Sequence, residues 1–347
     1  MAEVSAHKGL KWPEGGFRPA VVVYRGDHPE SVHRASIAVV DPEGRLVRAF
    51  GEPEAMVFLR SAAKPFQAMA LVESGAFEAF GLSLEELAVV CGSHGGEDFH
   101  VEAVLSILSK CGLGEDRLRC GVVPPLHRPT ASRMAKEGKS PTPSRNPCSG
   151  KHAGMLCVCR HLGFELEGYE RSSHPVQRMS LRIVSEVTDH PEEEVWTALD
   201  GCGVPVFGVP LRKMALAYAR LARPESSPRH EVSLKLVRRA MLENPLMVAG
   251  SGRFTTRLIE VSGKTLVAKD GAEGVFGVGH LPSGLGLAVK VEDGSDRALS
   301  AVVLKALSEL ELLPPEAIED LGSLLKPPVK TASGEVAGRI EALDLFG

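Results

Sequence analysis

The sequence predicts a mixed α+β (α/β) fold, in which segments from both ends of the chain form one antiparallel sheet and a mainly helical lobe is inserted between them. Three observations support this prediction. Short apolar runs bounded by turn residues lie near both ends, helical spacing dominates the middle, and 347 residues suffice for two lobes. We therefore expect residues 18–60 and 250–347 to form a sheet-containing lobe, and residues 61–249 to form a mainly helical lobe.

The expected strands fall into two groups, one near each end of the chain. In the first group, the last two strands are joined by the turn-forming residues Asp41-Pro42-Glu43-Gly44. The second group precedes a helix expected over Ser295–Leu310. The strands are predicted at Ala20–Tyr24, Ser36–Val40, Leu46–Phe50, Thr265–Ala268, Val275–Val278 and Leu285–Val291.

The middle of the chain shows helix starts and helical spacing. Ser83 with Glu86 three residues later forms a capping box before an apolar run. Residues 121–147 contain many prolines and few apolar residues, so they predict a long irregular loop, and such loops are usually functional. Further helices are predicted at Phe99–Leu108, Ser149–Leu162, Pro175–Val187, Leu211–Leu221 and Val232–Leu242.

Composition narrows the functional class. Hydrophobic residues make up 44% and charged residues 24%, which is typical of a folded globular protein. The formal net charge of -4 lacks the basic excess of proteins that bind nucleic acids or anionic membranes. Met1–Lys11 holds no apolar run of signal-peptide length and no stretch reaches membrane-span length, so we expect a cytoplasmic protein. The chain has seven cysteines. In cytoplasmic proteins, cysteines are more often metal ligands, reactive thiols or packing residues than disulfide partners.

The first candidate site is Ser61, three residues before Lys64, a spacing that places both side chains on one face at the start of a helix. A serine hydroxyl is a weak nucleophile near neutral pH, and a neutral lysine within reach can remove its proton. The Ser-x-x-Lys pattern also arises by chance, and Ser323 with Lys326 repeats it in a polar tail. Because an apolar helix follows Ser61, we favour Ser61 over Ser323.

Two further segments are candidates for the walls of a cleft. Cys91–Glu97 is a glycine-rich turn that contains Ser93, and its glycines would let a ligand approach the backbone, although a simple helix-ending turn has the same composition. Lys269 begins a Lys-Asp-Gly sequence on or just after a C-terminal strand. At that place its ammonium would face a substrate. The alternative is an edge lysine before a turn.

A third segment, Asn146–Gly154, places Cys148 and Lys151 three residues apart at a predicted helix start, where the helix dipole favours a thiolate. It is not a phosphate-binding P-loop, because the first P-loop glycine is missing and His152 replaces the required Ser or Thr. Cys202 lies between two glycines further along the chain. Three interpretations of Cys148 and Cys202 remain open: they are unrelated buried thiols, they form a redox pair, or they are two ligands of one metal.

Together and in this order, these segments resemble the L-asparaginase II family of the inducible Rhizobium type. The resemblance runs from about residue 18 to the C-terminus, and its most specific element is Asn146–Gly154. The fold of this family resembles that of serine β-lactamases and glutaminases, in agreement with the order of strands, helices and strands. The matching segments are Arg60–Gln67, Cys91–Glu97, Asn146–Gly154, Asp200–Phe207 and Lys269–Gly274, with weaker matches at Glu30–His33 and Gly250–Arg253.

The resemblance implies catalytic roles for two serines and two lysines. Ser61 would be the nucleophile and Lys64 its base. Ser93 and a second lysine would form a neighbouring proton relay, and we assign that lysine to Lys269. This set implies an acyl-enzyme on Ser61 as the intermediate of amide hydrolysis.

Two of these assignments have alternatives. Lys290 is the less favoured choice for the second lysine. Ser144, in the sequence Ser144-Arg145-Asn146, also fits the Ser-x-Asn pattern that supplies the second serine of serine β-lactamases. We favour Ser93 because the asparaginase resemblance places this serine in the glycine-rich turn.

The resemblance also implies one zinc ion per chain, held by two cysteines and a lysine that correspond to Cys148, Lys151 and Cys202. It implies a homodimer as well. For contacts to the substrate we select Arg60, Asp200 and His152. The remaining cysteines would then be packing residues: Cys91, Cys111, Cys120, Cys157 and Cys159.

The activity implied by the resemblance is hydrolysis of the side-chain amide of L-asparagine to L-aspartate and ammonia. One alternative is a related serine amidohydrolase or acyl transferase that acts on glutamine or on a peptide-like amide. Another, from a different class, is an inactive zinc-stabilised protein that binds an amino acid without converting it.

Overall fold

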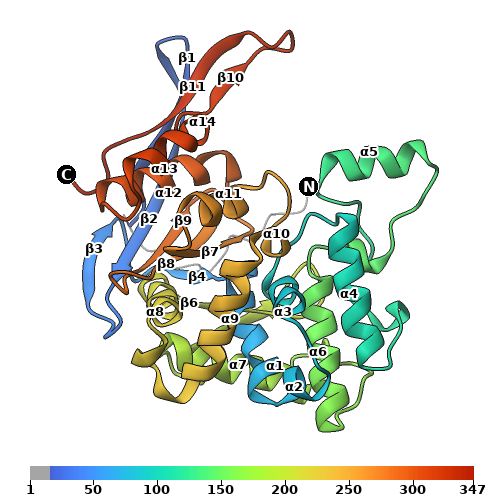
Figure 1. The fold of residues 1–347 in the computed structure, drawn as a ribbon. Helices are drawn as coiled ribbons and strands as arrows, with labels where there is room; N and C mark the ends of the chain where they lie inside the picture. The colour runs from blue at the N-terminus through green and yellow to red at the C-terminus, as the bar shows by residue number, and fades with distance from the viewer. Residues whose placement is uncertain (1–15) are drawn as a thin grey trace, which may run out of the picture.

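The computed structural model describes residues 16–347 (Figure 1). The segment Met1–Lys11, which we expect to lack an export signal, lies outside the described residues. Within the described part of the chain, no helix combines the length and the apolar character that a membrane crossing requires.

One eight-stranded sheet is built from both ends of the chain. Its strands are β1 (Arg18–Arg25), β2 (His28–Val40), β3 (Leu46–Phe50), β7 (Leu266–Gly271), β8 (Val275–His280), β9 (Gly286–Val291), β10 (Pro328–Lys330) and β11 (Val336–Ala342). The order across the sheet is β10-β11-β1-β2-β9-β8-β7, with β3 paired to β2, and the pairs are antiparallel. The central pair joins the two ends of the sequence, with Ile37 opposite Val289. The predicted fold class is therefore confirmed.

Helices pack against this sheet and lie beside it, whereas the ends of β1, β10 and β11 extend beyond them (Figure 1). They are α1 (Lys64–Glu73), α2 (Ala76–Ala79), α3 (Leu84–Cys91), α4 (Asp98–Lys110), α5 (Arg128–Lys136), α6 (Ser149–Leu162), α7 (Pro175–Thr188), α8 (Leu211–Ala222), α9 (Glu231–Glu243), α10 (Pro245–Val248), α11 (Phe254–Val261), α12 (Asp296–Glu309), α13 (Pro315–Asp320) and α14 (Gly322–Leu325). All residues of α1 except Glu73 are buried, and α3, α6, α7 and α9 pack around it. The helix that starts at Lys64 therefore anchors the neighbouring helices.

Opposite faces of the sheet have different coverings. Gly277 of β8 faces α8, where an added Cβ would lie 2.0 Å from the ring of Tyr218. The adjacent Phe276 points to the other face and, with Leu299 of α12, lines a cleft. Because helices cover both faces, the inner strands are almost continuously apolar rather than alternating.

A second, three-stranded sheet was not expected from the sequence. It has the order β4-β6-β5, with β4 at Met56–Phe58, β6 at Pro205–Pro210 and β5 at Trp196–Leu199. Sequence patterning missed β4 because it has only three residues, and β5 because all of its residues are exposed. The sheet brings the chain that precedes Ser61 beside the chain that follows Cys202.

The segment 121–147 is not irregular throughout, as the sequence predicted. It contains α5 and a short 3-10 turn at Pro143–Arg145. In α5 only Thr130 and Met134 are buried, so no apolar period marks this helix in the sequence. The helix stands away from the body of the molecule in Figure 1.

Candidate active site

Ser61 lies on a short 3-10 turn, Arg60–Ala63, which connects β4 to α1. Arg60 has a positive φ of 49°, a conformation that is costly for a residue with a side chain. Neighbouring parts of the fold must therefore stabilise this turn.

Three contacts from distant parts of the chain hold the turn. The N–H of Leu59 donates to the carbonyl oxygen of Phe207 in β6 at 2.9 Å. The Tyr218 hydroxyl donates to the carbonyl oxygen of Ala62 at 2.8 Å. Gly271, at the end of β7, lies so close that an added Cβ would be 2.7 Å from the oxygen of Leu59. Both sheets and α8 thus position Ser61.

Lys64 is fully buried, and its ammonium has three acceptors. Its Nζ donates to the oxygen of Gly92 at 2.7 Å, to Oγ of Ser93 at 2.8 Å and to the oxygen of Pro147 at 3.1 Å. These three hydrogen bonds use all the protons of an ammonium. The direct contact of Lys64 is therefore with Ser93, whereas the Ser-x-x-Lys spacing predicts a contact with Ser61.

The glycine-rich turn after α3 presents Ser93 to Lys64. The N–H of Ser93 donates to the oxygen of Val248 at 2.8 Å. At Gly92, an added Cβ would lie 2.6 Å from the oxygen of Met247, so the turn can approach this segment only with glycine at that position. The glycines that the sequence showed thus permit close backbone packing.

The alternative serine and lysine lie elsewhere. Ser144 is fully buried, and its hydroxyl forms a hydrogen bond with the Thr142 hydroxyl at 3.1 Å. Lys290 donates to the oxygen of Glu273 at 2.8 Å. Neither side chain lines the cleft. The structure therefore places Ser93, and not Ser144, next to a buried lysine.

Lys269 is fully buried on β7, where its Nζ donates to the backbone oxygen of Asp270 at 2.7 Å and to Oδ1 of the same residue at 2.8 Å. Burial lowers the pKa of Lys269 to about 8; the nearby charge of Lys64 adds to this effect, and Asp270 opposes it. A lysine with such a pKa is partly neutral near pH 8 and can exchange protons there.

Asp270 joins Lys269 to a second wall of the cleft. Its carboxylate accepts from Thr255 Oγ1 at 2.8 Å and from Arg253 Nη2 at 3.2 Å. Burial alone would raise the pKa of Asp270, but Lys269 and Arg253 hold it well below its ordinary value. Sequence reasoning did not select Asp270, Thr255 or Arg253, although the weak family match at Gly250–Arg253 includes the arginine.

These groups surround a cleft of about 700 Å³. Six of the side chains singled out in the sequence are among its lining residues: Arg60, Ser61, Ser93, Cys148, Asp200 and Cys202. The lysines predicted for the site are buried behind these walls: Lys64, Lys151 and Lys269. Three more charged side chains complete the lining: Arg253, Asp270 and Asp296. The predicted residues therefore converge from five separate segments.

The three proposed metal ligands lie together at one side of the cleft. Nζ of Lys151 is 3.2 Å from Sγ of Cys202, and the N–H of Cys148 donates to Oδ1 of Asn146 at 2.8 Å. A hydrogen bond from Cys202, together with the ammoniums of Lys64 and Lys151, holds the pKa of Cys148 well below its ordinary value, despite burial. This side of the cleft therefore favours a thiolate at Cys148.

The donor set fits a metal that prefers nitrogen and sulfur ligands, as zinc does. Among residues 16–347, no group of three or more His, Cys, Asp or Glu side chains is arranged to hold a metal ion. A metal at this place would therefore need the amine of Lys151 beside the thiols of Cys148 and Cys202.

Arg60 and Asp200, selected separately as substrate contacts, form a pair. The Arg60 guanidinium donates from Nε at 3.1 Å, and its Nη2 lies 3.0 Å from the same Asp200 oxygen. The N–H of Gly201 donates to this oxygen at 2.8 Å. The pair lies in the wall of the cleft, next to Ser61 on one side and Cys202 on the other.

The structure does not place His152 at the cleft, which corrects its selection as a substrate contact. His152 is fully buried in α6, and its Nδ1 forms a hydrogen bond with the Tyr169 hydroxyl at 2.7 Å. The sequence placed it next to Lys151, but one helical step of about 100° turns it into the core.

The prediction that the other cysteines are packing residues is confirmed by their burial, and the described cysteines form no disulfide.

A cleft that presents serine hydroxyls backed by buried lysines is the arrangement of a hydrolytic enzyme with an activated serine. Residues 21–342 match the family described as L-asparaginase II. The chain therefore belongs to the L-asparaginase II family of amidohydrolases. None of the curated proteins compared with it matches.

Similar solved structures have low sequence identity. The native form of Mglu has 17% identity and a TM-score of 0.46, over 82% of this chain and 67% of that one. A Bacillus glutaminase has 14% identity and a TM-score of 0.39, over 80% of this chain and 91% of that one. A β-lactamase from Mycobacterium bovis has 17% identity and a TM-score of 0.40, over 79% of this chain and 94% of that one. Likenesses of this size say nothing about the activity of this chain.

Proposed function

We propose that the chain hydrolyses the side-chain amide of L-asparagine to L-aspartate and ammonia, with Ser61 as the nucleophile. The observation that carries the proposal is that Ser61 and Ser93 line one cleft, with Lys64 hydrogen-bonded to Ser93 and with Lys64 and Lys269 both fully buried. Membership of the L-asparaginase II family supports amide hydrolysis as the reaction.

The reaction would proceed in two steps. In the first, Oγ of Ser61 gives up its proton and bonds to the amide carbon; the C–N bond then breaks, and the nitrogen takes up a proton and leaves as ammonia. In the second, water gives up a proton as it attacks the ester carbon. The ester C–O bond then breaks, and Ser61 regains its proton.

The contacts of Lys64 suggest the route of this proton. Because Lys64 donates to Ser93, we assign the Ser93 hydroxyl as the bridge between Ser61 and a neutral Lys64. Burial, together with the charge of Lys64, lowers the pKa of Lys269 to about 8, so Lys269 can take up and release a proton near that pH. We therefore assign Lys269 to the proton relay.

The negative oxygen of the intermediate also needs donors. The first turn of a helix leaves its N–H groups without partners inside the helix, and Ser61 lies in such a turn. We assign the Ser61 N–H to the oxyanion.

Charged groups in the walls would recognise the amino-acid part of the substrate. Arg253 uses one guanidinium nitrogen on Asp270 and has a side chain that is 38% exposed, so we assign it to the α-carboxylate. The pair of Arg60 and Asp200 would face the other polar groups of the substrate.

We also propose one zinc ion on Cys148, Lys151 and Cys202. When bound there, zinc would act as a Lewis acid that orients the substrate, because Ser61 already supplies the nucleophile. The closeness of Lys151 to Cys202 and the low pKa of Cys148 support this ligand set.

Ammonia release by the purified protein tests the proposal. We expect turnover of L-asparagine, a loss of at least about 1,000-fold in Ser61→Ala, and normal rates in Ser323→Ala, which changes the exposed Ser-x-x-Lys serine. Near-normal activity of Ser61→Ala would exclude Ser61 as the nucleophile.

Two other results would favour the alternatives. Faster turnover of glutamine or of a peptide-like amide would indicate another serine amidohydrolase or an acyl transferase. Thermal stabilisation by L-asparagine without turnover would indicate a binding protein. The homodimer and the cytoplasmic location stay predictions, which light scattering and cell fractionation test.

A further inference from the structure

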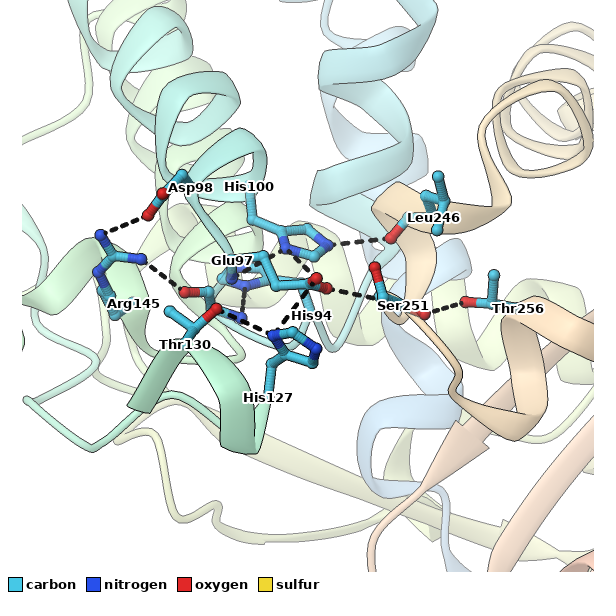
Figure 2. A network of polar contacts seen from close by, with 12 residues as sticks. His94, Glu97, Asp98, His100, His127, Thr130, Arg145, Leu246, Ser251 and Thr256 are labelled. Atoms are coloured by element: carbon cyan, nitrogen blue, oxygen red, sulfur yellow. Dashed lines mark hydrogen bonds and ion pairs between the residues drawn. The ribbon is translucent and has the colours of Figure 1, made fainter. Parts of the chain in front are cut away.

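Glu97, the last residue of the glycine-rich turn, has a buried carboxylate that takes no part in the proposed chemistry and does not line the cleft. Figure 2 shows it at the centre of a polar network formed by His94, His100, His127 and Ser251. A buried carboxylate is costly unless several donors face it. The groups that face the carboxylate come from two separate segments, histidines fix the turn that carries Glu97 itself, and all three segments lead into the cleft.

The first segment is 250–253. The N–H of Ser251 donates to Oε1 of Glu97 at 2.9 Å. Gly250, with a φ of +117°, lies so close that an added Cβ would be 2.7 Å from this oxygen. Two residues after Ser251, Arg253 enters the cleft and pairs with Asp270. The carboxylate therefore fixes the start of the segment that carries Arg253.

The second segment is the one before α5. Nδ1 of His127 lies 3.4 Å from Oε2 of Glu97 and 2.9 Å from the Thr130 hydroxyl. The N–H of His127 donates to the oxygen of Gly95 at 2.9 Å. Because His127 follows Leu126, which lines the cleft, Glu97 also holds this wall.

The third segment is the turn itself, which two neutral histidines shape. Gly96 donates its N–H to Nδ1 of His94 at 3.2 Å, and Glu97 donates its N–H to Nδ1 of His100 at 3.2 Å. Each Nε2 then carries the hydrogen, and that of His100 donates to the oxygen of Leu246 at 2.9 Å. Burial lowers the pKa of His100 to about 4, and the two rings stack with centroids 4.7 Å apart. The turn that presents Ser93 is thus locked to the segment that leads to Arg253.

We infer that Glu97 is a positioning residue, which fixes the Ser93 turn relative to the Arg253 segment across the cleft. This inference rests on the proposed function for its kinetic consequences. Hydrogen bonds from backbone N–H groups to a carboxylate are strong because the acceptor is charged. Removing the carboxylate leaves the Ser251 N–H without its acceptor, so both segments gain freedom.

The test compares Glu97→Ala and Glu97→Gln with Glu86→Ala. Glu86 is a matched control, because its carboxylate is equally buried and accepts from Ser83, Ser106 and Lys110, but it lies at the opposite end of α3 from the Ser93 turn. A structural role common to buried carboxylates would affect the Glu86 and Glu97 variants alike.

The first readout is amide hydrogen exchange, which needs no substrate. In Glu97→Ala we expect exchange to speed up by about tenfold or more in both 92–97 and 246–256, relative to Glu86→Ala. Glu97→Gln keeps an acceptor for the Ser251 N–H, so it should show less than half of this increase. Equal protection of both segments in the Glu97 and Glu86 variants would overturn the inference, whether or not the protein hydrolyses asparagine.

The second readout is kinetic. With L-asparagine, Glu97→Ala should lower kcat through Ser93 and raise KM through Arg253, with kcat/KM reduced by roughly 10- to 100-fold. Glu86→Ala should leave KM unchanged, because this substitution affects stability and the molecules that stay folded have an intact cleft. An unchanged KM in Glu97→Ala would overturn the inference, whereas absence of turnover in the wild-type protein would overturn only the proposed function.

If Glu97→Ala does not fold, a comparison of the KM values of Glu97→Gln and Glu97→Asp tests the inference instead. Aspartate keeps the charge but is one methylene shorter, so it cannot reach both Ser251 and His127 as glutamate does. We expect Glu97→Asp to raise KM more than Glu97→Gln, and the reverse order would overturn the inference.

Discussion

The two Ser-x-x-Lys sequences of this chain show how differently one pattern can be used. Lys64 is fully buried and donates to three oxygens around the cleft. Lys326 has a side chain that is 58% exposed and pairs with Glu341 at 2.6 Å on the surface. The same spacing therefore yields a buried, hydrogen-bonded lysine in one place and a solvated ion pair in the other.

The difference comes from the surroundings of each helix start. Helices cover α1 on nearly all sides, so its first residue must find polar partners inside the protein. The residues of α14 are not buried, so Lys326 keeps its hydration. Only the first of these sites is suited to activating a serine, because only there is the lysine buried and hydrogen-bonded to a serine that lines the cleft.

The largest expected effect is that of Lys64→Ala compared with Lys326→Ala. Removing the Lys64 amine leaves Gly92, Ser93 and Pro147 without their donor, which should cost about 1–3 kcal/mol of unfolding free energy. Ammonia release should fall at least about 1,000-fold. Lys326→Ala should change the unfolding free energy by no more than about 0.5 kcal/mol. Urea unfolding and activity assays check both, and a Lys64→Ala enzyme with over a tenth of normal activity contradicts the comparison.

The next effect separates the two candidate second serines. Ser93→Ala should lower kcat by about 100-fold, because the hydroxyl next to Lys64 is lost. Ser144→Ala removes a hydroxyl that contacts Thr142 and Glu115 and does not line the cleft, so kcat should change by less than about twofold. Steady-state kinetics of both variants measure this, and equal losses in kcat would show that the contact with Lys64 is irrelevant.

The pH dependence tests whether burial tunes the lysines. If proton loss from Lys269 promotes the reaction, kcat should rise with pH through about 8, and Lys269→Met should remove this rise. In the unfolded chain the pKa is near 10.5, so the unfolded state binds more protons between pH 8 and 10.5. Wild-type stability relative to Lys269→Met should therefore increase with pH across that window. A flat difference in unfolding free energy would contradict the lowered pKa.

The smallest expected effect concerns the cysteines, of which Cys148 and Cys202 line the cleft whereas Cys159 lies in the core. Elemental analysis should find about one zinc per chain, reduced by more than about half in Cys148→Ser and in Cys202→Ser. Cys159→Ala, which changes a cysteine in the core, should keep the metal. Zinc bound equally by the three variants would exclude the ligand set.

Much of the sheet was predictable because its strands are apolar runs bounded by turns, as in β8 and β9. The first half of β2 and all of β10 were missed, since their residues are mostly exposed and no alternation marks them. Short strands such as β4 carry too few residues for any period. Pairing with distant segments, which a local pattern does not record, decides their structure.

For the site, the sequence and the family resemblance together selected Ser61, Ser93, Cys148 and Cys202, and all four line the cleft. They could not show that Lys64 contacts Ser93, because this hydrogen bond depends on packing between α1 and α3. His152, which was selected as a substrate contact, instead lies in the core against Tyr169, because the helical step from Lys151 turns it away from the cleft. The contacts of Glu97 could not be predicted from the sequence, because its partners are backbone groups and histidines that only the fold brings together.

The pairing of β1 with β11 has a consequence for biosynthesis. Val23 pairs with Ile340, so the edge of the first strand stays open until nearly the whole chain has left the ribosome. The Ser61 turn likewise awaits Gly271 of β7, which is translated much later. Nascent chains should therefore remain inactive and dependent on chaperones until late in synthesis, and slow closure of the sheet should limit refolding.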